Sequence, residues 1–260
     1  MTPPITAILQ RIYGLYCWLV FVSVALVALA LVLVTPGMTI RRAINRNGAR
    51  IVLWACAIHC RIVHAKRIPN GPCVVVANHT SYIDGVVMAA VLPPRFSFVI
   101  KKEMNSVPLA NWLLRRIGSE FVERSDRHKG AGDARRVLRS AQRGQALAFF
   151  PEGTFSRRPG LLRFHAGAFT TAARMGWPVV PAVIRGAREI LPAHRLLPAP
   201  GAISVDFIEV LMPAGADRDA ANQLRDRCRN DILAALGEDD LDEKGDRAHV
   251  AAGHSHGKIH

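Results

Sequence analysis

The sequence lacks several features that mark common classes of protein. Five cysteines are present, but none forms a C-x-x-C pair, the spacing typical of structural zinc sites and dithiol redox centres. No Gly-x-Ser-x-Gly motif occurs, which argues against a serine esterase. The basic residues are scattered and no recognition motif accompanies them, so we expect no nucleic-acid partner. The cysteines are expected to be reduced thiols that pack as small hydrophobic side chains, as in a cytoplasmic domain.

Charge is also absent from a long stretch near the N-terminus. No charged residue occurs between Arg11 and Arg41, and residues 14–34 are almost continuously apolar. As a helix, this stretch would rise about 30 Å, the thickness of the hydrocarbon core of a bilayer. A cleaved signal peptide is the alternative, because Ala28-Leu29-Ala30 resembles a cleavage site. The apolar run continues beyond that site, however, which favours an uncleaved membrane anchor.

Arginines follow the apolar run closely, at positions Arg41, Arg42, Arg46 and Arg50. By the positive-inside rule they place the body of the protein on the cytoplasmic side of the inner membrane. Residues 51–60 form a second apolar stretch. It is too short to span a bilayer, so it predicts a short interfacial helix.

The chain carries a formal net charge of +14, and the C-terminal residues conceal how basic the rest is. Residues 1–237 contain 31 basic and 14 acidic side chains, whereas six of the twenty acids lie in residues 238–247. Such a surface favours anionic lipid headgroups, phosphorylated substrates or an acidic carrier protein as partners.

Strand-like and helix-like segments alternate through the middle of the chain. The strand-like runs are 74–77, 96–100, 120–123, 146–150, 179–184 and 203–210, and the helical runs are 81–92, 109–117, 133–142, 166–175 and 220–236. This alternation predicts an α/β fold with a mixed, largely parallel sheet flanked by helices. We therefore expect three parts: the anchor and interfacial helix in 1–60, an α/β domain in 61–237, and a disordered charged and His-rich tail in 238–260. The tail offers His254 and His256 as a pair, but without further ligands it is a poor metal site, so no metal is expected.

A histidine and a carboxylate follow the first of these strands, in the segment Asn78-His79-Thr80-Ser81-Tyr82-Ile83-Asp84. His79 is placed at a strand end and Asp84 in the first turn of a helix. A neutral imidazole can take a proton from a hydroxyl, and a carboxylate on its other nitrogen fixes the tautomer. The structural alternative is a capping box formed by Ser81 and Asp84, which does not account for the preceding Asn78-His79.

Two other segments carry candidate site residues. Phe149-Phe150-Pro151-Glu152-Gly153-Thr154 places an acid, a glycine and a hydroxyl at the end of another expected parallel strand. The alternative is an ordinary Pro-x-Gly turn with a solvated glutamate. Arg124 ends a short strand, where it can grip a phosphate or simply be solvated.

Taken together, these segments resemble the motifs of the glycerophospholipid acyltransferase family. The first motif, Asn-His-x-Ser-x-x-Asp, is complete here. The second, which ends in Phe-Ile-x-Arg after a glycine, is met by Gly118, Phe121, Val122 and Arg124, the third by Phe150 to Thr154 with Ser156, and the fourth by an apolar stretch around Pro181. The resemblance covers roughly residues 60–210, and the order of four motifs makes it specific.

The resemblance implies a membrane-bound O-acyltransferase. Its expected reaction moves a fatty acyl group from a coenzyme A or acyl-carrier-protein thioester to the sn-2 hydroxyl of lysophosphatidic acid, giving phosphatidic acid. His79 would be the general base and Asp84 its partner. The residues expected to bind the acceptor are Phe121, Arg124, Glu152, Gly153 and Thr154. Neither a cofactor nor a metal is required, and the partners are membrane lipids and the acyl donor.

Two departures from the family pattern bear on the acceptor. Phe155 stands where the family usually has arginine, and His165 stands where many members have lysine. Other acceptors therefore remain open: lyso-ornithine lipid, another lysophospholipid, or glycerol 3-phosphate. An alternative of a different class is a non-catalytic membrane protein that binds lipid or a carrier protein.

Overall fold

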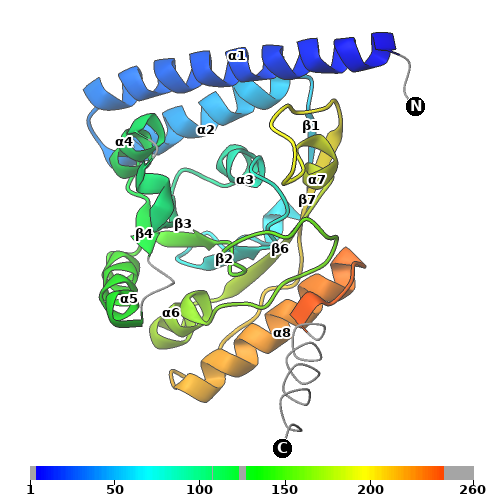
Figure 1. Cartoon of the computed structure of the whole chain (residues 1–260). Helices are drawn as coiled ribbons and strands as arrows, with labels where there is room; N and C mark the ends of the chain where they lie inside the picture. Colours follow the sequence, from blue (N-terminus) through cyan, green and yellow to red (C-terminus); the bar gives the residue numbers. More distant parts are fainter. Residues whose placement is uncertain (1–3, 107, 123–126, 243–260) are drawn as a thin grey trace, which may run out of the picture.

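A seven-stranded sheet forms the centre of the computed structural model, which describes residues 4–106, 108–122 and 127–242 (Figure 1). Its strands are β1 (His59–Val63), β2 (Val74–Ala77), β3 (Phe96–Lys101), β4 (Glu120–Val122), β5 (Ala146–Phe149), β6 (Val179–Arg185) and β7 (Ala202–Phe207). They lie in the order β1-β7-β6-β2-β5-β3-β4. All neighbours pair in parallel except β6 and β7, which are antiparallel. The expected mixed, largely parallel sheet is confirmed.

Helices cover both faces of this sheet (Figure 1). They are α1 (Pro4–Val34), α2 (Met38–Ala55), α3 (Asp84–Val91), α4 (Pro108–Arg116), α5 (Arg127–Gln142), α6 (Gly167–Met175), α7 (Ala187–Ile190) and α8 (Arg218–Leu236). One core cluster lies between the sheet and α2, α3 and α7, and the other lies between the sheet and α5, α6 and α8. Strand β2 contributes alternate residues to the two clusters and is fully buried, which is why its sequence is a continuous apolar run.

The order of the central strands brings two of the sequence motifs together. Strand β2 lies between β5 and β6, with Val76 paired to Phe149 on one side and Pro181 on the other. Because β2 and β5 are parallel, the segments that follow Ala77 and Phe149 leave the sheet at the same edge. That edge is where open α/β sheets place their ligand sites.

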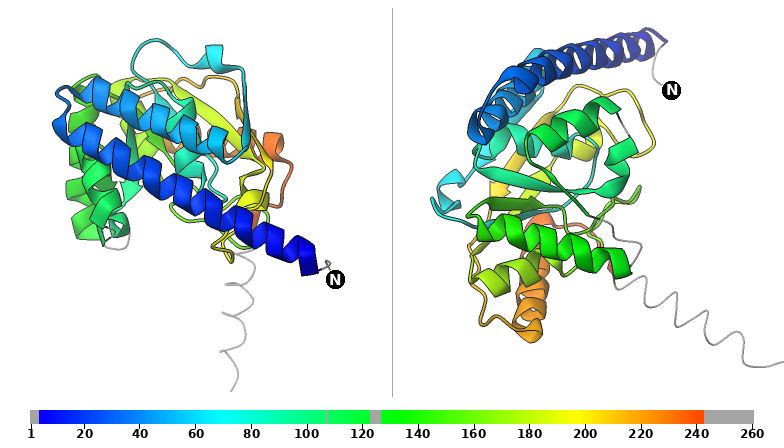
Figure 2. Two further views of the ribbon diagram at one scale, coloured as in Figure 1. Left: turned by 90° about the horizontal axis from the view of Figure 1, so that it is seen from above. Right: turned by 90° about the vertical axis from the view of Figure 1, so that its left-hand side faces the viewer.

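Helix α1 lies along the outside of the domain beside α2, and its N-terminal turns extend past the other elements (Figure 2). Within Thr6–Val34 the most apolar 18-residue stretch has a mean hydropathy of 3.0, and the helix is long and apolar enough to cross a membrane. Only 22% of its most apolar stretch is buried, so most of its apolar surface faces outward. The sequence-based expectation of a long apolar N-terminal helix is confirmed.

The second helix differs from the expectation of a short apolar helix over 51–60. Helix α2 begins at Met38 and ends at Ala55, and residues 59 and 60 already belong to β1. The helix is amphipathic, and Ala49, Val52 and Leu53 are among its buried residues. Polar residues interrupt the apolar ones in its sequence, so the helix does not form a continuous apolar run.

Arg42, one of the four arginines to which the positive-inside rule was applied, is buried inside the protein. Arg42 of α2 donates to the carbonyls of Ile117 and Arg95 and to the side-chain oxygen of Gln145. Its guanidinium thus joins α2 to the loops beneath it, so it is not free to meet a lipid headgroup.

The C-terminal residues that the structure describes are bonded to the domain. Glu238 accepts a hydrogen bond from the backbone of Gly160, and Asp240 pairs with Arg229, which is largely buried in α8. Residues 238–242, which we expected to belong to a disordered tail, therefore pack against the loop between β5 and α6, at Gly160 and Leu161. The rest of that segment, with its histidines, lies outside the described residues.

Candidate active site

Asn78 ties the end of β2 to β6. Its side chain is fully buried, its Oδ1 accepts the N–H of Ile184 at 2.7 Å, and its Nδ2 donates to the Ile184 carbonyl at 3.0 Å. An asparagine amide supplies one acceptor and two donors, so it can satisfy both backbone groups at once. The chain can therefore leave the sheet directly before His79 while the N–H and carbonyl of Ile184 in β6 stay hydrogen-bonded.

His79 and Asp84 meet as the sequence predicts. Nδ1 of His79 lies 2.9 Å from Oδ2 of Asp84, and the carboxylate is fully buried as the first residue of α3. The same Oδ2 accepts the backbone N–H groups of Thr80 at 2.6 Å and Ser81 at 2.8 Å. The bond from the Ser81 N–H is the one that the acid of a capping box accepts. The reciprocal bond is not formed, because the Ser81 hydroxyl accepts the N–H of Ile83 and donates to the carbonyl of Leu191.

This arrangement determines the chemistry open to the imidazole. A hydrogen bond from Nδ1–H to the carboxylate leaves the lone pair on Nε2. The His79 side chain keeps 19% of its surface exposed, so it stands at the boundary between the core and solvent. An imidazole held in this tautomer can accept a proton from a hydroxyl group brought to Nε2.

Aromatic rings enclose the imidazole. Phe150 stacks on it with 4.4 Å between ring centroids, and Phe155 meets it edge-on at 4.7 Å. Tyr82 in turn meets Phe155 edge-on at 4.8 Å and is largely exposed. The departure at Phe155 therefore has a direct structural effect, because an apolar ring lies beside the imidazole where the family pattern has a cation.

Glu152 is buried at the same edge of the sheet and is bonded to backbone through both oxygens. Its Oε1 accepts the N–H of His79 at 2.6 Å, and its Oε2 accepts the N–H of Leu162 at 2.8 Å. Burial raises the pKa of Glu152 to about 7, although the two N–H groups and the charge of Arg188 act in the opposite direction. The alternative of a solvated turn glutamate is wrong.

The other expected site residues are not all brought together. Gly153 adopts a positive φ of 73° in the turn after β5, and Thr154 is exposed beside it. Phe121 is buried in β4, three strands from β2, with the guanidinium of Arg115 5.2 Å from its ring centre. Arg124 lies outside the described residues.

Arg188 is a neighbour of the site that no sequence signal singled out. It lies in α7, and its Nη2 donates to Glu238 at 3.1 Å. Its Nε and Nη1 are buried and have no hydrogen-bond partner within the described part of the chain. In the sequence it is a single arginine shortly after the fourth motif, which alone resembles a solvated surface residue. Among the described residues, no group of three or more His, Cys, Asp or Glu side chains is placed to hold a metal ion.

Comparison with known proteins agrees with the motifs. Residues 59–185 match the family model named Acyltransferase. The chain is 32% identical over 191 residues to a 1-acyl-sn-glycerol-3-phosphate acyltransferase of Neisseria gonorrhoeae, covering 67% of this chain and 73% of that protein. It is 30% identical over 165 residues to a chloroplastic 1-acyl-sn-glycerol-3-phosphate acyltransferase of Brassica napus, covering 64% of this chain and about half (46%) of the relative.

Two further comparisons concern the acceptor and the fold. The chain is 34% identical over 128 residues to the lyso-ornithine lipid O-acyltransferase of Pseudomonas aeruginosa, covering 48% of this chain and 47% of that protein. A solved structure, the 1-acyl-sn-glycerophosphate acyltransferase PlsC from Thermotoga maritima, superposes with a TM-score of 0.72 at 21% identity, over 88% of this chain and 96% of that one. The match in structure establishes the shared fold. By its sequence similarity to the Neisseria protein, the chain belongs to the 1-acyl-sn-glycerol-3-phosphate acyltransferase family of O-acyltransferases.

Proposed function

We propose that this protein transfers a fatty acyl group from a thioester to the sn-2 hydroxyl of lysophosphatidic acid. The observation that carries the proposal is the His79 imidazole, fixed by a buried carboxylate at the edge of the sheet where β2 and β5 end. The family membership supplies the reaction class, and the geometry supplies the base.

In the proposed step, Nε2 of His79 takes the proton of the acceptor hydroxyl while its oxygen attacks the thioester carbonyl. The carbon–sulfur bond then breaks, and the leaving thiolate receives the proton from the imidazolium. The products are an ester and a free thiol of coenzyme A or acyl carrier protein. No acyl-enzyme forms, so the step needs no serine or cysteine nucleophile.

Asp84 stabilises the positive charge that develops on His79 during this step. It acts at 2.9 Å from Nδ1 and from a fully buried position, where a charge interacts more strongly than in water. The N–H groups of Thr80 and Ser81 hold the carboxylate in place, so no reorganisation is needed as the charge forms.

Glu152 is better explained as a positioning residue than as an acceptor ligand. Both of its oxygens already accept backbone N–H groups, and one of these belongs to His79. We therefore propose that Glu152 fixes the backbone from which the imidazole projects. Acceptor contacts then remain with Gly153 and the exposed Thr154. We keep the phosphate role for Arg124, which follows Phe121 by three residues in the sequence.

We also propose that the surface formed by α1, α2, α4 and the loop at Leu196 binds the cytoplasmic side of the membrane, where the acyl donors occur. Large exposed hydrophobic side chains gather on the elements of this face: Ile8, Leu9, Ile12, Leu15, Leu19, Val22, Leu26, Val27 and Leu31 of α1, Ile40, Ile51 and Trp54 of α2, Leu109 and Trp112 of α4, and Leu196. A surface of this size is typical of membrane contact.

The packing of α1 favours a position within one leaflet. Tyr13 and Tyr16 donate to the carbonyls of Cys56 and Ala55 at the end of α2, and Trp18 donates to the carbonyl of Leu196 at 2.7 Å. These bonds hold α1 along the domain. A helix crossing the bilayer would have to give them up, so the apolar face as a whole is proposed to enter the membrane surface.

A second acceptor is favoured by one observation. Phe155 places an aromatic ring beside His79 where the family pattern has arginine, and a relative at 34% identity is named for lyso-ornithine lipid. An acceptor without a phosphate monoester would not need a cation at that position. Lyso-ornithine lipid is therefore the alternative to lysophosphatidic acid. The non-catalytic alternative disagrees with membership of an O-acyltransferase family.

The test is a panel of acceptors and donors with purified full-length protein in detergent. Lysophosphatidic acid, lyso-ornithine lipid, lysophosphatidylethanolamine and glycerol 3-phosphate are each offered with labelled acyl-CoA or acyl carrier protein, with His79→Ala as the control. We expect label on lysophosphatidic acid with wild type and none with the variant. Label on lyso-ornithine lipid alone would show that this lipid, and not lysophosphatidic acid, is the acceptor. Undiminished transfer by His79→Ala would overturn the mechanism.

A further inference from the structure

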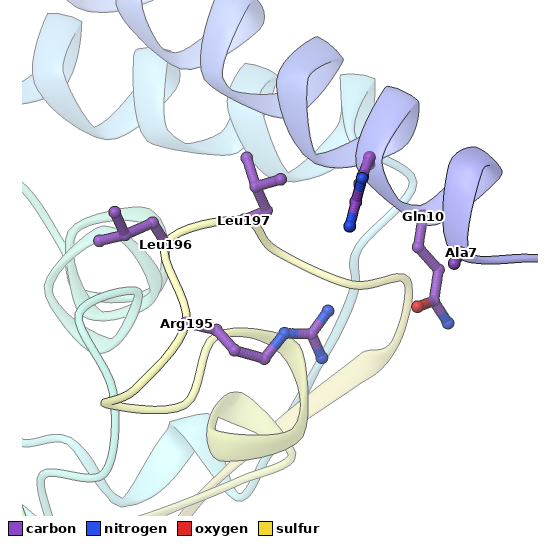
Figure 3. Close-up of a pocket in the computed structure, with 6 residues that line it drawn as sticks. Ala7, Gln10, Arg195, Leu196 and Leu197 are labelled. Carbon is purple, nitrogen blue, oxygen red and sulfur yellow. The ribbon is translucent and has the colours of Figure 1, made fainter. Parts of the chain in front are cut away.

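A cavity of about 280 Å³ lies between the N-terminal part of α1 and the loop that follows α7 (Figure 3). Its lining comes from two segments far apart in the sequence, Ala7, Gln10 and Arg11 of α1 and Arg195, Leu196 and Leu197 of the loop. In Figure 3 the side chain of Gln10 leaves α1 on the side of the loop, and the side chain of Arg195 lies beneath the segment that carries Leu196 and Leu197. The cavity is separate from the His79 site, since none of its lining residues contacts the imidazole or its carboxylate.

The charge of this cavity is entirely positive. Arg11 and Arg195 each contribute a guanidinium, Gln10 adds an amide, and none of the lining residues is acidic. Within the described part of the chain, neither arginine forms an ion pair. Two permanently charged groups that line one cavity without a carboxylate favour an anion, and the guanidinium fork matches the geometry of phosphate oxygens.

The surroundings of the cavity indicate where that anion comes from. Ile8, Leu9 and Ile12 on the same turns of α1 are more than half exposed, and Leu196 in the loop is 78% exposed. Arg11 is the last charged residue before the apolar stretch begins. An arginine at the end of such a stretch lies at the headgroup level of a bilayer while its apolar neighbours lie deeper.

The loop that carries Arg195 is attached to α1 near its middle and to the segment after His79 at its start. Trp18 of α1 donates to the carbonyl of Leu196 at 2.7 Å, and Gly14 packs so closely on Leu197 that a Cβ there would lie 2.7 Å from it. At the start of the loop, Ser81 donates to the carbonyl of Leu191 at 2.6 Å. Ser81 directly follows the His79–Thr80 segment, so the loop links α1 to the segment that bears the imidazole.

We propose that this cavity binds the phosphate of an anionic membrane phospholipid, with Arg11 and Arg195 as its ligands. The lipid is a bystander and not the acyl acceptor, and its phosphate joins α1 to the 191–201 loop at the membrane surface. The site adds to the proposed acyl-transfer function and depends on it only through the membrane-facing surface that both share.

The test is flotation of the full chain with vesicles of phosphatidylcholine alone or with phosphatidylglycerol added. We expect wild type to bind the phosphatidylglycerol vesicles more strongly, and the double variant Arg11→Gln, Arg195→Gln to lose roughly tenfold or more of that preference. The matched control is Arg174→Gln, Arg218→Gln, which removes the same charge from exposed positions on α6 and α8, across the sheet from α1. Equal loss in the control would overturn the proposal.

A second variant distinguishes specific binding of a phosphate from general electrostatic attraction to an anionic membrane. Arg11→Lys, Arg195→Lys keeps both charges but loses the forked donors. A phosphate site predicts that the lysine variant recovers only part of the preference for phosphatidylglycerol, and that phospholipid copurifies with wild type and not with the glutamine variant. Full recovery by lysine, or no phospholipid in native mass spectra of wild type, would overturn the site.

Two further measurements distinguish the remaining explanations. Titration with inorganic phosphate in the absence of vesicles tests whether a free anion is the ligand; binding as tight as that of the phosphatidylglycerol headgroup would overturn the lipid assignment. Acyl transfer to a detergent-dispersed acceptor is expected to persist in the glutamine variant. If all transfer were absent from wild type while the flotation results held, the proposed function would fail and the lipid site would stand.

Discussion

Glu152 contacts His79 through the backbone and not through the imidazole. Its Oε1 accepts the His79 N–H at 2.6 Å while its Oε2 accepts the N–H of Leu162 at 2.8 Å. One carboxylate thus joins the segment after β2 to the loop after β5, and each of its oxygens accepts one backbone N–H.

The first prediction concerns this link. Glu152→Gln keeps the shape of the side chain but turns an NH₂ group toward one of the two N–H donors, so one bond is lost and the His79 backbone shifts. We expect kcat to fall about 10- to 100-fold with a smaller change in KM, since a misplaced catalytic group costs rate more than binding. Steady-state kinetics beside Glu189→Gln, an exposed glutamate on α7, provide the measurement and its control. A rise in KM with unchanged kcat would show that Glu152 binds the acceptor instead.

The raised pKa of Glu152 gives a second prediction, on stability. Burial raises the pKa of this carboxyl from 4.5 to about 7 in the folded protein. Between these values the folded state holds a proton that the unfolded state releases, so the free energy of unfolding falls as pH rises from about 4.5 to about 7. The loss is of order 3 kcal/mol for one group.

Thermal unfolding of wild type and Glu152→Gln across that pH range measures this contribution. The variant has no ionisable group at the position, so we expect its Tm to fall less than that of wild type as pH rises from 4.5 through 7, with this difference complete at about pH 8. Parallel curves would mean that Glu152 ionises as a solvated carboxyl does.

The third prediction compares the His–Asp pair proposed as catalytic with a second His–Asp pair in the same protein. Asp84→Asn removes the charge beside His79 and allows the wrong imidazole tautomer, so kcat should fall roughly 10²- to 10⁴-fold with little change in KM. The chain offers a matched control, because His64 and Asp206 form a second pair at 2.8 Å on the exposed side of β1 and β7. Asp206→Asn should leave kcat unchanged. Equal losses in the two variants would point to a general folding defect.

Much of the domain could be predicted because its signals are local. The buried run of β2 is apolar throughout, and the His79 motif follows it directly, so both the strand and the His79–Asp84 contact were expected. Parallel pairing then predicts that the Glu152 segment lies at the same edge of the sheet. It does not predict that Glu152 bonds to the backbone of His79 and Leu162.

What could not be predicted depends on contacts between distant segments. Both hydrogen-bond partners of the Asn78 side chain, one donor and one acceptor, belong to Ile184, 106 residues away. The carbonyls that hold Arg42 are likewise brought near only by the fold. Helix α2 was misjudged because an amphipathic helix with a narrow buried stripe resembles a polar segment followed by a short apolar one. A single residue such as Phe155 shows no periodicity, so its contact with His79 had no sequence signal beyond its departure from the family pattern.

The fourth prediction tests Asn78. Asn78→Ala leaves the N–H and carbonyl of Ile184 unbonded in a fully buried site, at a cost of about 1–3 kcal/mol for each group. We expect a lower Tm and a secondary loss of kcat as the end of β2 loosens. Asn70→Ala, at an exposed position before β2, is the control and should change neither. An unchanged Tm for Asn78→Ala would show that water replaces the amide without cost.

The last prediction concerns the acceptor and rests on Phe155. Its ring meets His79 edge-on at 4.7 Å, while Phe150 stacks on the imidazole independently at 4.4 Å, so the base stays supported when residue 155 is changed. Phe155→Arg restores the cation of the family pattern beside the base. A charge-assisted bond to the phosphate of lysophosphatidic acid contributes about 1.5–3 kcal/mol.

The ratio of kcat/KM for lysophosphatidic acid over that for lyso-ornithine lipid should therefore rise at least about tenfold in Phe155→Arg. Phe155→Leu keeps the position apolar and removes only the ring, so it should lower kcat for both acceptors and leave their ratio unchanged. If the ratio stays constant in the arginine variant as well, residue 155 does not face the acceptor headgroup. The choice of acceptor would then have to be made by residues on other segments, with Arg124 the first to substitute.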